Sequence, residues 1–466
     1  MQSRESSFAL SIVKGAAVML VLLSGLAAFA GATTTYTENT IYSFYSNSPD
    51  GVYPTRNGLV MDKAGNLYGT TINASCALNE LCVGAVFELS PNGSGGWTET
   101  VLHLFDPLST IDLNDGANPT GNIAIDSKGN LYGTCFQGGP GYLTGPYPYQ
   151  GSGIVWELSP PAPGSGNPWT ETVLYSFGAP GSGDGYRPYG GVTLASSAAT
   201  VLYGTTSSGG ANNDGTLFEL SYVKKTKTVP AHWTETILHS FYGPDGLAPV
   251  GELLLSGGNL YGYAPGGAYE HTDCYQCGVV FELQPGAGGW TENVLYNFGG
   301  STTDAWFNDF GGNGAPVIDA EKNLYGTTDG GGNYGKGSVW ELVYSAATET
   351  YSEQVIYSFG ENPDYVSPDW GLVYSKGSLF GATGGASGPL QGGSVFELTY
   401  TKPTKKAPGG WQERDLYDFP AASFGAGPGF DQLIEDSKGN WYGLLPGVGY
   451  GTEPYGAVFE LSPSTP

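Results

Sequence analysis

Basic residues are scarce in this chain: its 466 residues include 17 Lys and Arg against 43 Asp and Glu, a formal net charge of −26. So acidic a surface repels phosphate backbones and anionic lipid, which argues against nucleic acid and membrane surfaces as partners. Charged residues make up only 13% of the chain, whereas 40% of it is hydrophobic. Because that apolar fraction is too high for a disordered protein, we expect a folded one.

Long apolar runs are missing, with one exception at the N-terminus. Arg4 and Lys14 accompany the apolar stretch 15–28, and small residues that suit cleavage follow at 28–32. The stretch is too short to span a bilayer comfortably, and a polar segment comes directly after it. We therefore predict a secretory signal peptide over residues 1–32 and a secreted or periplasmic protein with no membrane insertion after cleavage. A retained N-terminal anchor is the alternative.

Cysteine is rare, with five in the chain. Cys76 and Cys82 bracket one loop, and Cys274 and Cys277 bracket another, so two local disulfides are predicted for an oxidising compartment. The Cys-x-x-Cys pair is also compatible with redox chemistry or half of a zinc site, but no second pair at metal spacing accompanies it. Cys135 is left over, and we expect it to be a buried free thiol.

Familiar catalytic motifs are absent as well. The sequence has no Gly-x-Ser-x-Gly elbow, no His-Glu-x-x-His pair and no phosphate-binding loop. His103 and His239 replace a tyrosine of a repeated strand and are interpreted as core, while His232 and His271 lie in separate repeats without metal spacing. We expect no metal and no cofactor. Because a site assembled from distant loops would not show in such a search, enzymatic activity is disfavoured but open.

What the chain does have is glycine, 76 in all, and three motifs that recur seven times in fixed order. Copies of the first, typified by Val-Leu-Tyr-Ser-Phe, end at Phe44, Phe105, Phe177, Phe241, Phe298, Phe359 and Phe419. Copies of the second, typified by Asn-Leu-Tyr-Gly, end at Gly69, Gly133, Gly204, Gly262, Gly326, Gly381 and Gly443. Copies of the third, typified by Val-Phe-Glu-Leu, end at Leu89, Leu158, Leu220, Leu283, Leu342, Leu398 and Leu461.

Each repeat unit holds four strand-length segments, a to d, of which d carries the first motif, b the second and c the third. Four-stranded antiparallel units repeated radially are propeller blades. The chain begins with a d segment (36–44) and finishes with a c segment (456–462), so the N-terminal strand is predicted to complete the last blade and close the ring. We predict an all-β, seven-bladed β-propeller as a single domain over 33–466, and a monomer. The alternatives are an open β-solenoid and two smaller β-domains.

The repeat unit also resembles a known family. Gly-x-Leu-x-x-Asp-x-x-Gly-Asn-Leu-Tyr-Gly-Thr-Thr, followed by Gly-x-Val-Phe-Glu-Leu and Val-Leu-Tyr-Ser-Phe, is similar to the bacterial GloVer tandem repeat of exported "choice-of-anchor" proteins. The resemblance covers residues 36 to 463 and implies an exported repeat protein of unknown function. It implies no catalytic residues. No C-terminal sorting segment is recognised, which puts a surface anchor in doubt.

Strand polarity places the long, variable b–c and d–a loops on one rim, which is the predicted binding surface. Repeated d–a loop aspartates offer carboxylates there for a cation or sugar hydroxyls, or else simply cap their own turns; they are Asp50, Asp115, Asp184, Asp245 and Asp364. Aromatic residues outside the repeat are candidate sugar platforms, or else pack the loops; they include Tyr142, Tyr186, Tyr189, Tyr269 and Trp306. The glutamate of strand c recurs seven times and is interpreted as structural.

Three functions remain open at this stage. The leading hypothesis is an exported, non-enzymatic module that binds a glycan or an extracellular protein through the long-loop rim. The second is a carbohydrate-active hydrolase or lyase with acidic residues at the axial mouth, and the third is a structural surface protein without a ligand. One pair of carboxylates with unlike surroundings on that rim would favour the enzyme, whereas a uniform ring of aspartates would favour binding or structure.

Overall fold

The computed structural model describes residues 34–45, 51–54, 58–73, 83–106, 115–139, 151–178, 181–267, 277–299, 304–306, 314–360, 368, 371–384, 392–404, 408–420, 432–446 and 455–464. These residues form strands, turns and loops, and none of them is helical. Accordingly, this part of the chain contains no helix of the length and hydrophobicity that crossing a bilayer requires. The predicted signal peptide lies outside the described residues.

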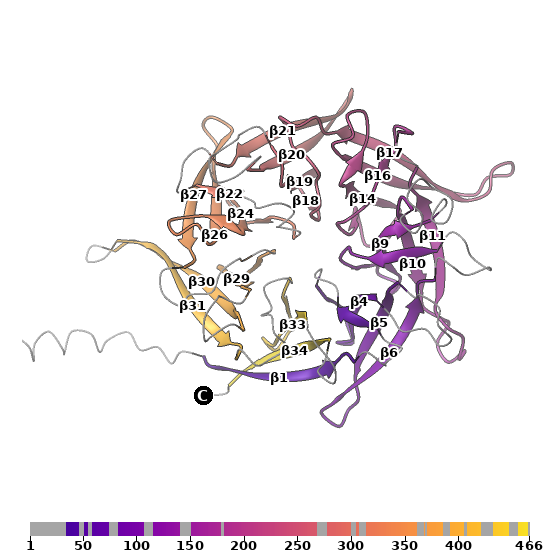
Figure 1. The fold of residues 1–466 in the computed structure, drawn as a ribbon, viewed down its shortest axis with the longest axis horizontal. Coiled ribbons are helices and arrows are strands. Elements are labelled where there is room, and N and C mark those ends of the chain that lie inside the picture. Colours follow the sequence, from indigo (N-terminus) through magenta and orange to yellow (C-terminus); the bar gives the residue numbers. More distant parts are fainter. Residues whose placement is uncertain are drawn as a thin grey trace, which may run out of the picture.

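Seven antiparallel sheets, each with strands in the order a-b-c-d, stand around a common axis (Figure 1). This arrangement confirms the predicted seven-bladed β-propeller. We number the blades 1 to 7 from the first complete a-b-c-d set, so that blade 7 holds the two ends of the chain. Strands a and b lie toward the centre of the ring, and strands d form its perimeter.

Strands a are the shortest, with two or three residues each. Strands a are β3 (Val60–Met61), β8 (Ala124–Ile125), β13 (Thr193–Leu194), β18 (Leu254–Ser256), β23 (Val317–Ile318), β28 (Val373–Ser375) and β32 (Ile434–Glu435). Strands b are β4 (Leu67–Asn73), β9 (Leu131–Gly138), β14 (Val201–Thr206), β19 (Asn259–Ala264), β24 (Leu324–Thr328), β29 (Ser378–Ala382) and β33 (Trp441–Pro446). Short extra strands pair beside them: β2 (Val52–Pro54), β7 (Gly116–Pro119), β12 (Gly185–Tyr186), β15 (Ser208–Gly209), β22 (Ala305–Trp306) and β25 (Gly330–Gly331).

Strands c and d have six to nine residues each. Strands c are β5 (Ala85–Pro91), β10 (Ile154–Ser159), β16 (Thr216–Val223), β20 (Val279–Gly286), β26 (Ser338–Ser345), β30 (Ser394–Thr401) and β34 (Gly456–Pro463). Strands d are β6 (Trp97–Leu104), β11 (Thr170–Ser176), β17 (His232–Ser240), β21 (Gly289–Asn297), β27 (Thr350–Ser358), β31 (Gly410–Asp418) and β1 (Tyr36–Ser43).

The N-terminal strand closes the ring, as the order of motifs predicts. β1 pairs antiparallel with β34, with Tyr36 opposite Pro463 at one end and Ser43 opposite Ala457 at the other (Figure 1). Blade 1 therefore lies next to blade 7 in the ring, as each other blade lies next to the one before it. Closure by pairing removes the unpaired edges that an open stack of sheets would leave.

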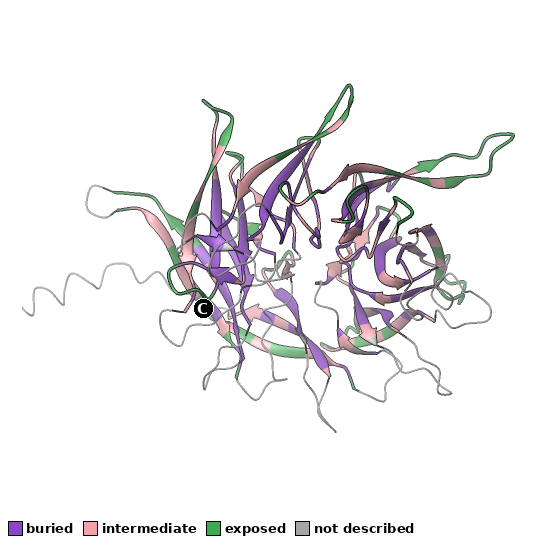
Figure 2. Cartoon of the chain, turned by 45° about the horizontal axis from the view of Figure 1, so that its top comes forward, coloured by how far each residue is buried: buried purple, intermediate pink, exposed green. Residues whose placement is uncertain are grey.

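The hydrophobic core lies between neighbouring blades. The motif phenylalanine that directly follows each strand d is buried and packs against the aromatic residue of strand c in the next blade: the ring centroids of Phe241 and Phe281 lie 5.2 Å apart, and those of Phe105 and Trp156 lie 5.8 Å apart. The motif glycine of strand b makes room for this ring, since a Cβ at Gly133 would lie 2.3 Å from the Trp156 indole. Figure 2 shows the resulting burial of the strand interiors, with exposure at the hairpin tips.

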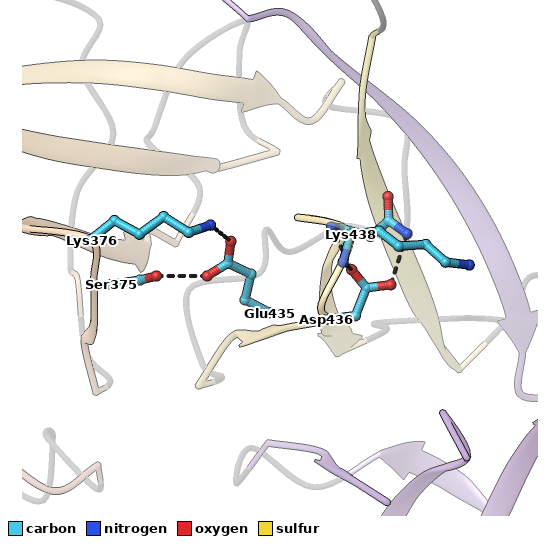
Figure 3. Close-up of polar contacts among 6 residues, drawn as sticks. Ser375, Lys376, Glu435, Asp436 and Lys438 are labelled. Atoms are coloured by element: carbon cyan, nitrogen blue, oxygen red, sulfur yellow. Dashed lines mark hydrogen bonds and ion pairs between the residues drawn. The ribbon is translucent and has the colours of Figure 1, made fainter. Parts of the chain in front are cut away.

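A carboxylate network fixes the a–b turns. In blade 7, Asp436 Oδ1 accepts hydrogen bonds from the backbone N–H groups of Lys438 and Asn440, and its Oδ2 accepts one from the Asn440 amide (Figure 3). The Asp-x-x-Gly-Asn motif is therefore a side-chain-capped turn. Next to it, Glu435 accepts hydrogen bonds from Ser375 at 2.7 Å and Lys376 at 2.6 Å, which joins the turn to blade 6.

The repeated glutamates of strand c belong to the same scaffold, as their sevenfold recurrence indicates. The strand-b tyrosine donates a hydrogen bond to this glutamate in several blades: Tyr325 to Glu341 at 3.0 Å and Tyr442 to Glu460 at 2.9 Å. These contacts give the glutamates a place in the scaffold.

Candidate functional site

The described loop aspartates lie beside the outermost strands, away from the axial mouth. Asp245 Oδ2 is 2.9 Å from Nε2 of His239 on β17, and Asp115 Oδ1 is 3.5 Å from Nε2 of His103 on β6. The Tyr175 hydroxyl on β11 donates a hydrogen bond to Asp184 Oδ2 at 2.9 Å. The remaining two predicted aspartates, Asp50 and Asp364, lie outside the described residues. These positions argue against a ring of carboxylates around the axis.

Each of these aspartates also caps the turn that follows strand d. Asp184 Oδ2 accepts a hydrogen bond from the Gly178 N–H at 2.7 Å, and Asp245 Oδ1 accepts one from the Tyr242 N–H at 2.9 Å. The turn-capping alternative of the sequence analysis is therefore present in the structure. An aspartate that the motif search missed, Asp304, does similar work in blade 5, where it accepts a hydrogen bond from the Tyr296 hydroxyl at 3.1 Å.

A glutamate from the next blade completes each contact, and we call the resulting group an inter-blade trio: a Tyr or His of strand d, the loop aspartate, and a glutamate of the following strand d. The trios with all three members described are His103–Asp115–Glu171, Tyr175–Asp184–Glu235, His239–Asp245–Glu292 and Tyr296–Asp304–Glu353. In both histidine trios the candidate ligand atoms all lie within 4.8 Å of one another.

A β-bulge in strand d allows one strand to serve two trios. In the pairing of β16 with β17, Leu217 lies opposite His239 but Phe218 lies opposite Ile237, so one residue is left over. In a regular strand, Glu235 and His239 would share a face because they are four residues apart. The extra residue shifts the alternation, so Glu235 faces the preceding blade and His239 faces the following one. All seven c–d pairs carry this register shift.

The trio glutamates hold their protons unusually tightly. Burial raises the pKa of Glu235 and Glu353 to about 7, and the neighbouring Asp184 and Asp304 carboxylates add to the shift. Burial raises the pKa of Glu292 to about 7 as well, although His239 partly offsets the shift. The phenol of Tyr175 also has a raised pKa, because it is buried beside Asp184. Near neutral pH these glutamates are therefore only partly ionised at the joints between blades.

Two of the predicted aromatic residues meet in one cluster on the long-loop rim. Tyr189 lies edge-to-face with Phe136 at 5.6 Å, and the Arg187 guanidinium lies over both Phe136 and Tyr186, 5.6 and 5.9 Å from the ring centroids. The Tyr186 hydroxyl donates a hydrogen bond to Asn213 at 2.8 Å. This cluster joins blades 2 and 3. Tyr142, Tyr269 and the side chain of Trp306 lie outside the described residues.

The two cysteines among the described residues differ in state: one is a free thiol and the other is in a disulfide. Cys135 is free and buried, as predicted, and burial next to Asp115 raises the pKa of its thiol. Cys277 is buried and disulfide-bonded. The pairings of Cys76 with Cys82 and of Cys274 with Cys277 stay predictions, because the other three cysteines lie outside the described residues.

Three polar side chains from separate blades converge on the axis. Asn122 of blade 2 donates a long hydrogen bond of 3.4 Å to Gln432 of blade 7, and it also hydrogen-bonds Glu252 of blade 4. None of these blades is a neighbour of another, so their side chains can meet only near the centre of the ring (Figure 1). Each residue lies two positions before its strand a, which places it at the end that carries the d–a loops.

This axial group breaks the repeat. The same position is Gly58, Gly191, Ala315 and Gly371 in the other four blades. Small residues there let the polypeptide chains approach closely, since a Cβ at Gly191 would lie 2.3 Å from the Asn122 carbonyl oxygen. Close packing therefore favours a small residue at this position. Asn122, Glu252 and Gln432 depart from that pattern.

Glu252 is the carboxyl at the centre of this group. Protein surrounds it closely, although it keeps some accessible surface, and this burial raises its pKa to about 7, with the Asn122 hydrogen bond acting in the opposite direction. The buried Tyr263 lies near enough for Glu252 to raise its pKa. Glu252 is not among the site residues predicted from the sequence, although an alignment of the seven repeat copies at this one position singles it out.

On the opposite rim, described residues of the repeat line hollows between blades. One, of 580 Å³, lies between blades 4 and 5 and includes Tyr261, Glu282 and Tyr344; another, of 730 Å³, lies between the turns of blades 7 and 1. Because Tyr261 and Glu282 occupy the scaffold positions of strands b and c, these hollows are a consequence of blade packing.

Comparison with known families identifies the repeat. The Gloeobacter/Verrucomicrobia repeat matches residues 26–218, 144–306 and 227–408 in three overlapping copies. The chain belongs to the Gloeobacter/Verrucomicrobia repeat family. This confirms the family resemblance of the repeat unit. A search of curated proteins gives no significant match.

Solved structures with a similar ring have little sequence in common with this chain. A protein of unknown function from Dyadobacter fermentans DSM 18053 is 9% identical, with 92% of this chain and 99% of that chain covered and a TM-score of 0.43. The GH93 α-L-arabinofuranosidase of Fusarium graminearum is 11% identical, with coverages of 92% and 98% and a TM-score of 0.42. The polysaccharide lyase Uly1 is 12% identical, with coverages of 94% and 95% and a TM-score of 0.46. Likeness at this level gives no basis for transferring an activity.

Proposed function

We propose that this protein is an exported binding module that holds a glycan at the axis of its ring, on the rim of the d–a loops. The observation that carries the proposal is the convergence of Asn122, Glu252 and Gln432 from three non-adjacent blades, at a position where the other blades have glycine or alanine. Export is supported by the N-terminal apolar stretch.

The chemistry of the axial group suits a polyhydroxylated ligand. Asn122 and Gln432 offer amide donors and acceptors, and Glu252 offers a carboxyl that can either donate or accept a hydrogen bond near neutral pH, because its pKa is raised to about 7. Sugar hydroxyls also both donate and accept. Convergent polar groups in a partly enclosed place are typical of small-molecule sites.

The aromatic cluster of blades 2 and 3 adjoins the axial group. Tyr189 precedes the Gly190–Gly191 segment, and Gly191 is the residue that packs against Asn122. Aromatic faces present apolar area to the C–H faces of sugars at little cost in conformational entropy. The cluster therefore supplies a platform next to the polar group, and we assign Tyr189 to the edge of the binding site.

One observation favours a second candidate function, a carbohydrate-active hydrolase or lyase. A carboxyl with a pKa near 7, like that of Glu252, suits general acid–base catalysis. Two-carboxylate hydrolysis needs a partner, however, and the described residues place no second carboxylate in this group. The enzyme alternative is therefore either a lyase, or a hydrolase whose second carboxylate comes from another loop.

A polysaccharide pull-down and glycan-array screen that records both retention and released sugars separates these functions. The binding module predicts retention by the wild-type protein without products, and loss of retention when Asn122 and Gln432 are changed to Ala, the residue at position 315. A matched control is Glu460→Gln, which alters a scaffold glutamate and should leave retention intact. Released sugars or unsaturated products that disappear in Glu252→Gln would replace the binding module with the enzyme.

A further inference from the structure

Two of the inter-blade trios carry a histidine where the others carry a tyrosine. Imidazole nitrogen is a common ligand for transition metals, whereas a neutral phenol is a poor one. His239, Asp245 and Glu292 thus offer one nitrogen and two carboxylate groups from two adjacent blades, and their ligand atoms lie within 4.8 Å of one another. Three protein ligands with an open position for water are a usual arrangement at zinc.

The three side chains at this place are held in position independently of any ion. The His239 ring stands edge-on to Phe241 at 4.8 Å, which fixes its orientation. The Asp245 side chain is only 5% exposed, and its Oδ1 accepts the Tyr242 N–H, which leaves Oδ2 directed at His239 Nε2 at 2.9 Å. Such contacts behind the ligands are what orient a metal site.

The third group brings an oxygen that the scaffold does not use. Among the described residues, Glu292 Oε1 is buried and has no hydrogen-bond partner, and Glu292 itself belongs to the blade that follows His239. A buried carboxylate oxygen without a partner is costly, and coordination is one way to satisfy it. This oxygen and the His239–Asp245 pair face one another across the joint between blades 3 and 4.

The same arrangement occurs a second time, two blades away. His103, Asp115 and Glu171 form the trio between blades 1 and 2, with His103 edge-on to Phe105 at 4.7 Å and Asp115 oriented by the Gly116 N–H at 2.7 Å. Between the two lies a tyrosine trio, in which the Tyr175 hydroxyl donates to Asp184 and Glu235 Oε1 is likewise buried without a hydrogen-bond partner among the described residues, so the imidazole is what distinguishes the histidine trios. The fold thus contains its own metal-free comparison.

We propose that His239, Asp245 and Glu292 bind a divalent transition-metal ion of the zinc class, and that His103, Asp115 and Glu171 form a second such site. The ion takes His239 Nε2, Asp245 Oδ2 and a Glu292 oxygen as ligands, with water in the open position. It replaces the hydrogen bond between His239 and Asp245 and joins strand d of blade 3 to strand d of blade 4. This site differs from the expectation of no metal, because its three ligands are far apart in the sequence and meet only across a blade joint.

Zinc stoichiometry tests the proposal. The whole protein, prepared without a histidine tag and treated with a chelator, is titrated with Zn²⁺, and bound metal is measured after dialysis. Two ions per chain are expected for the wild type, one for His239→Tyr or His103→Tyr, and none for the double variant. These substitutions restore the residue found at the other joints, so they are expected to fold.

A variant that creates a new metal site tests the proposal in the opposite direction. Tyr175→His places an imidazole beside Asp184 and Glu235, and it should add a third ion. Co²⁺ in place of Zn²⁺ should give visible absorption bands in the wild type that the double His→Tyr variant lacks. As a control, removing His232, whose side chain is exposed and bonds only its own segment, should change neither readout. Equal zinc content in the wild type and the double variant would overturn the proposal.

Discussion

The perimeter of the ring and its axis are built on different principles. Between neighbouring d strands, the trio of Tyr or His, Asp and Glu recurs from joint to joint, as at Tyr175–Asp184–Glu235 and Tyr296–Asp304–Glu353. At the axis, one position carries Asn, Glu or Gln in three blades and Gly or Ala in four. The trio is complete at the four joints whose members are all described, and we assign it to holding blades together. A polar residue that departs from the repeat in three blades is not required by the scaffold. The difference separates residues for stability from residues for binding.

The core between blades should give the largest effect on stability. Phe241→Ala removes a fully buried ring that packs on Phe281 of the next blade, and we expect it to lower the free energy of unfolding by about 3–5 kcal/mol. Denaturant unfolding followed by tryptophan fluorescence measures the change. A loss below about 1 kcal/mol would mean that the blade joint does not depend on this contact.

A close approach between blades should give the next largest effect. Gly153 has a φ of 92°, and a Cβ there would lie 2.4 Å from Pro188 of the next blade. Gly153→Ala is therefore expected to cost about 2–3 kcal/mol, from backbone strain and from displacement of the proline. Gly164→Ala, at a turn where nothing lies within 4 Å, is the control for strain alone, and it should cost less.

The trio glutamates should give a smaller effect that depends on pH. Glu235 and Glu353 have pKa values raised from 4.5 to about 7. A carboxyl with a higher pKa in the folded protein binds its proton more tightly there, so stability is greatest below pH 4.5 and falls as pH rises to about 7. We expect a fall of about 1 kcal/mol per group, less than the full ~1.4 kcal/mol per pKa unit because both are partly exposed.

Thermal melts between pH 4.5 and 8 check this dependence. The double variant Glu235→Gln, Glu353→Gln keeps the shape of both side chains without their charge, so its stability should fall less over this range than that of the wild type. A pH dependence identical to that of the wild type would show that these carboxyls titrate normally in the folded protein.

The axial group should have the smallest effect on stability. Asn122→Ala and Gln432→Ala introduce the small side chain that blade 5 carries at the same position, and the hydrogen bond between them is long. We expect each to change the free energy of unfolding by about 0.5 kcal/mol or less. A loss of several kcal/mol would move these residues into the scaffold and blur the contrast between perimeter and axis.

The ring itself could be predicted from the sequence, because three motifs recur seven times in fixed order and each unit holds four strand-length segments. Ring closure also followed, since the chain starts on a d segment and finishes on a c segment. The trio could not be predicted in the same way. Period-two alternation puts Glu235 and His239 on one face, and only the bulge opposite Leu217 and Phe218 places them at different joints.

The axial group was missed for a different reason. Asn122, Glu252 and Gln432 belong to no motif, and each is unremarkable in its own segment. Their meeting depends on the closure of the ring, which brings together blades 2, 4 and 7. The predicted loop aspartates were assigned to the same rim, but the contacts of Asp184 with β11 and the next blade place them at the perimeter.

The measurement that tests this account most directly compares glycan retention and thermal stability in two variants of opposite design. One removes the axial group by Asn122→Ala, Glu252→Ala and Gln432→Ala, and the other alters the perimeter by Glu235→Gln and Glu353→Gln. The account predicts that the axial variant loses retention while it keeps a melting temperature close to that of the wild type, and that the perimeter variant retains glycan with an altered pH dependence of melting. Full retention by the axial variant, or loss of retention only in the perimeter variant, would contradict it.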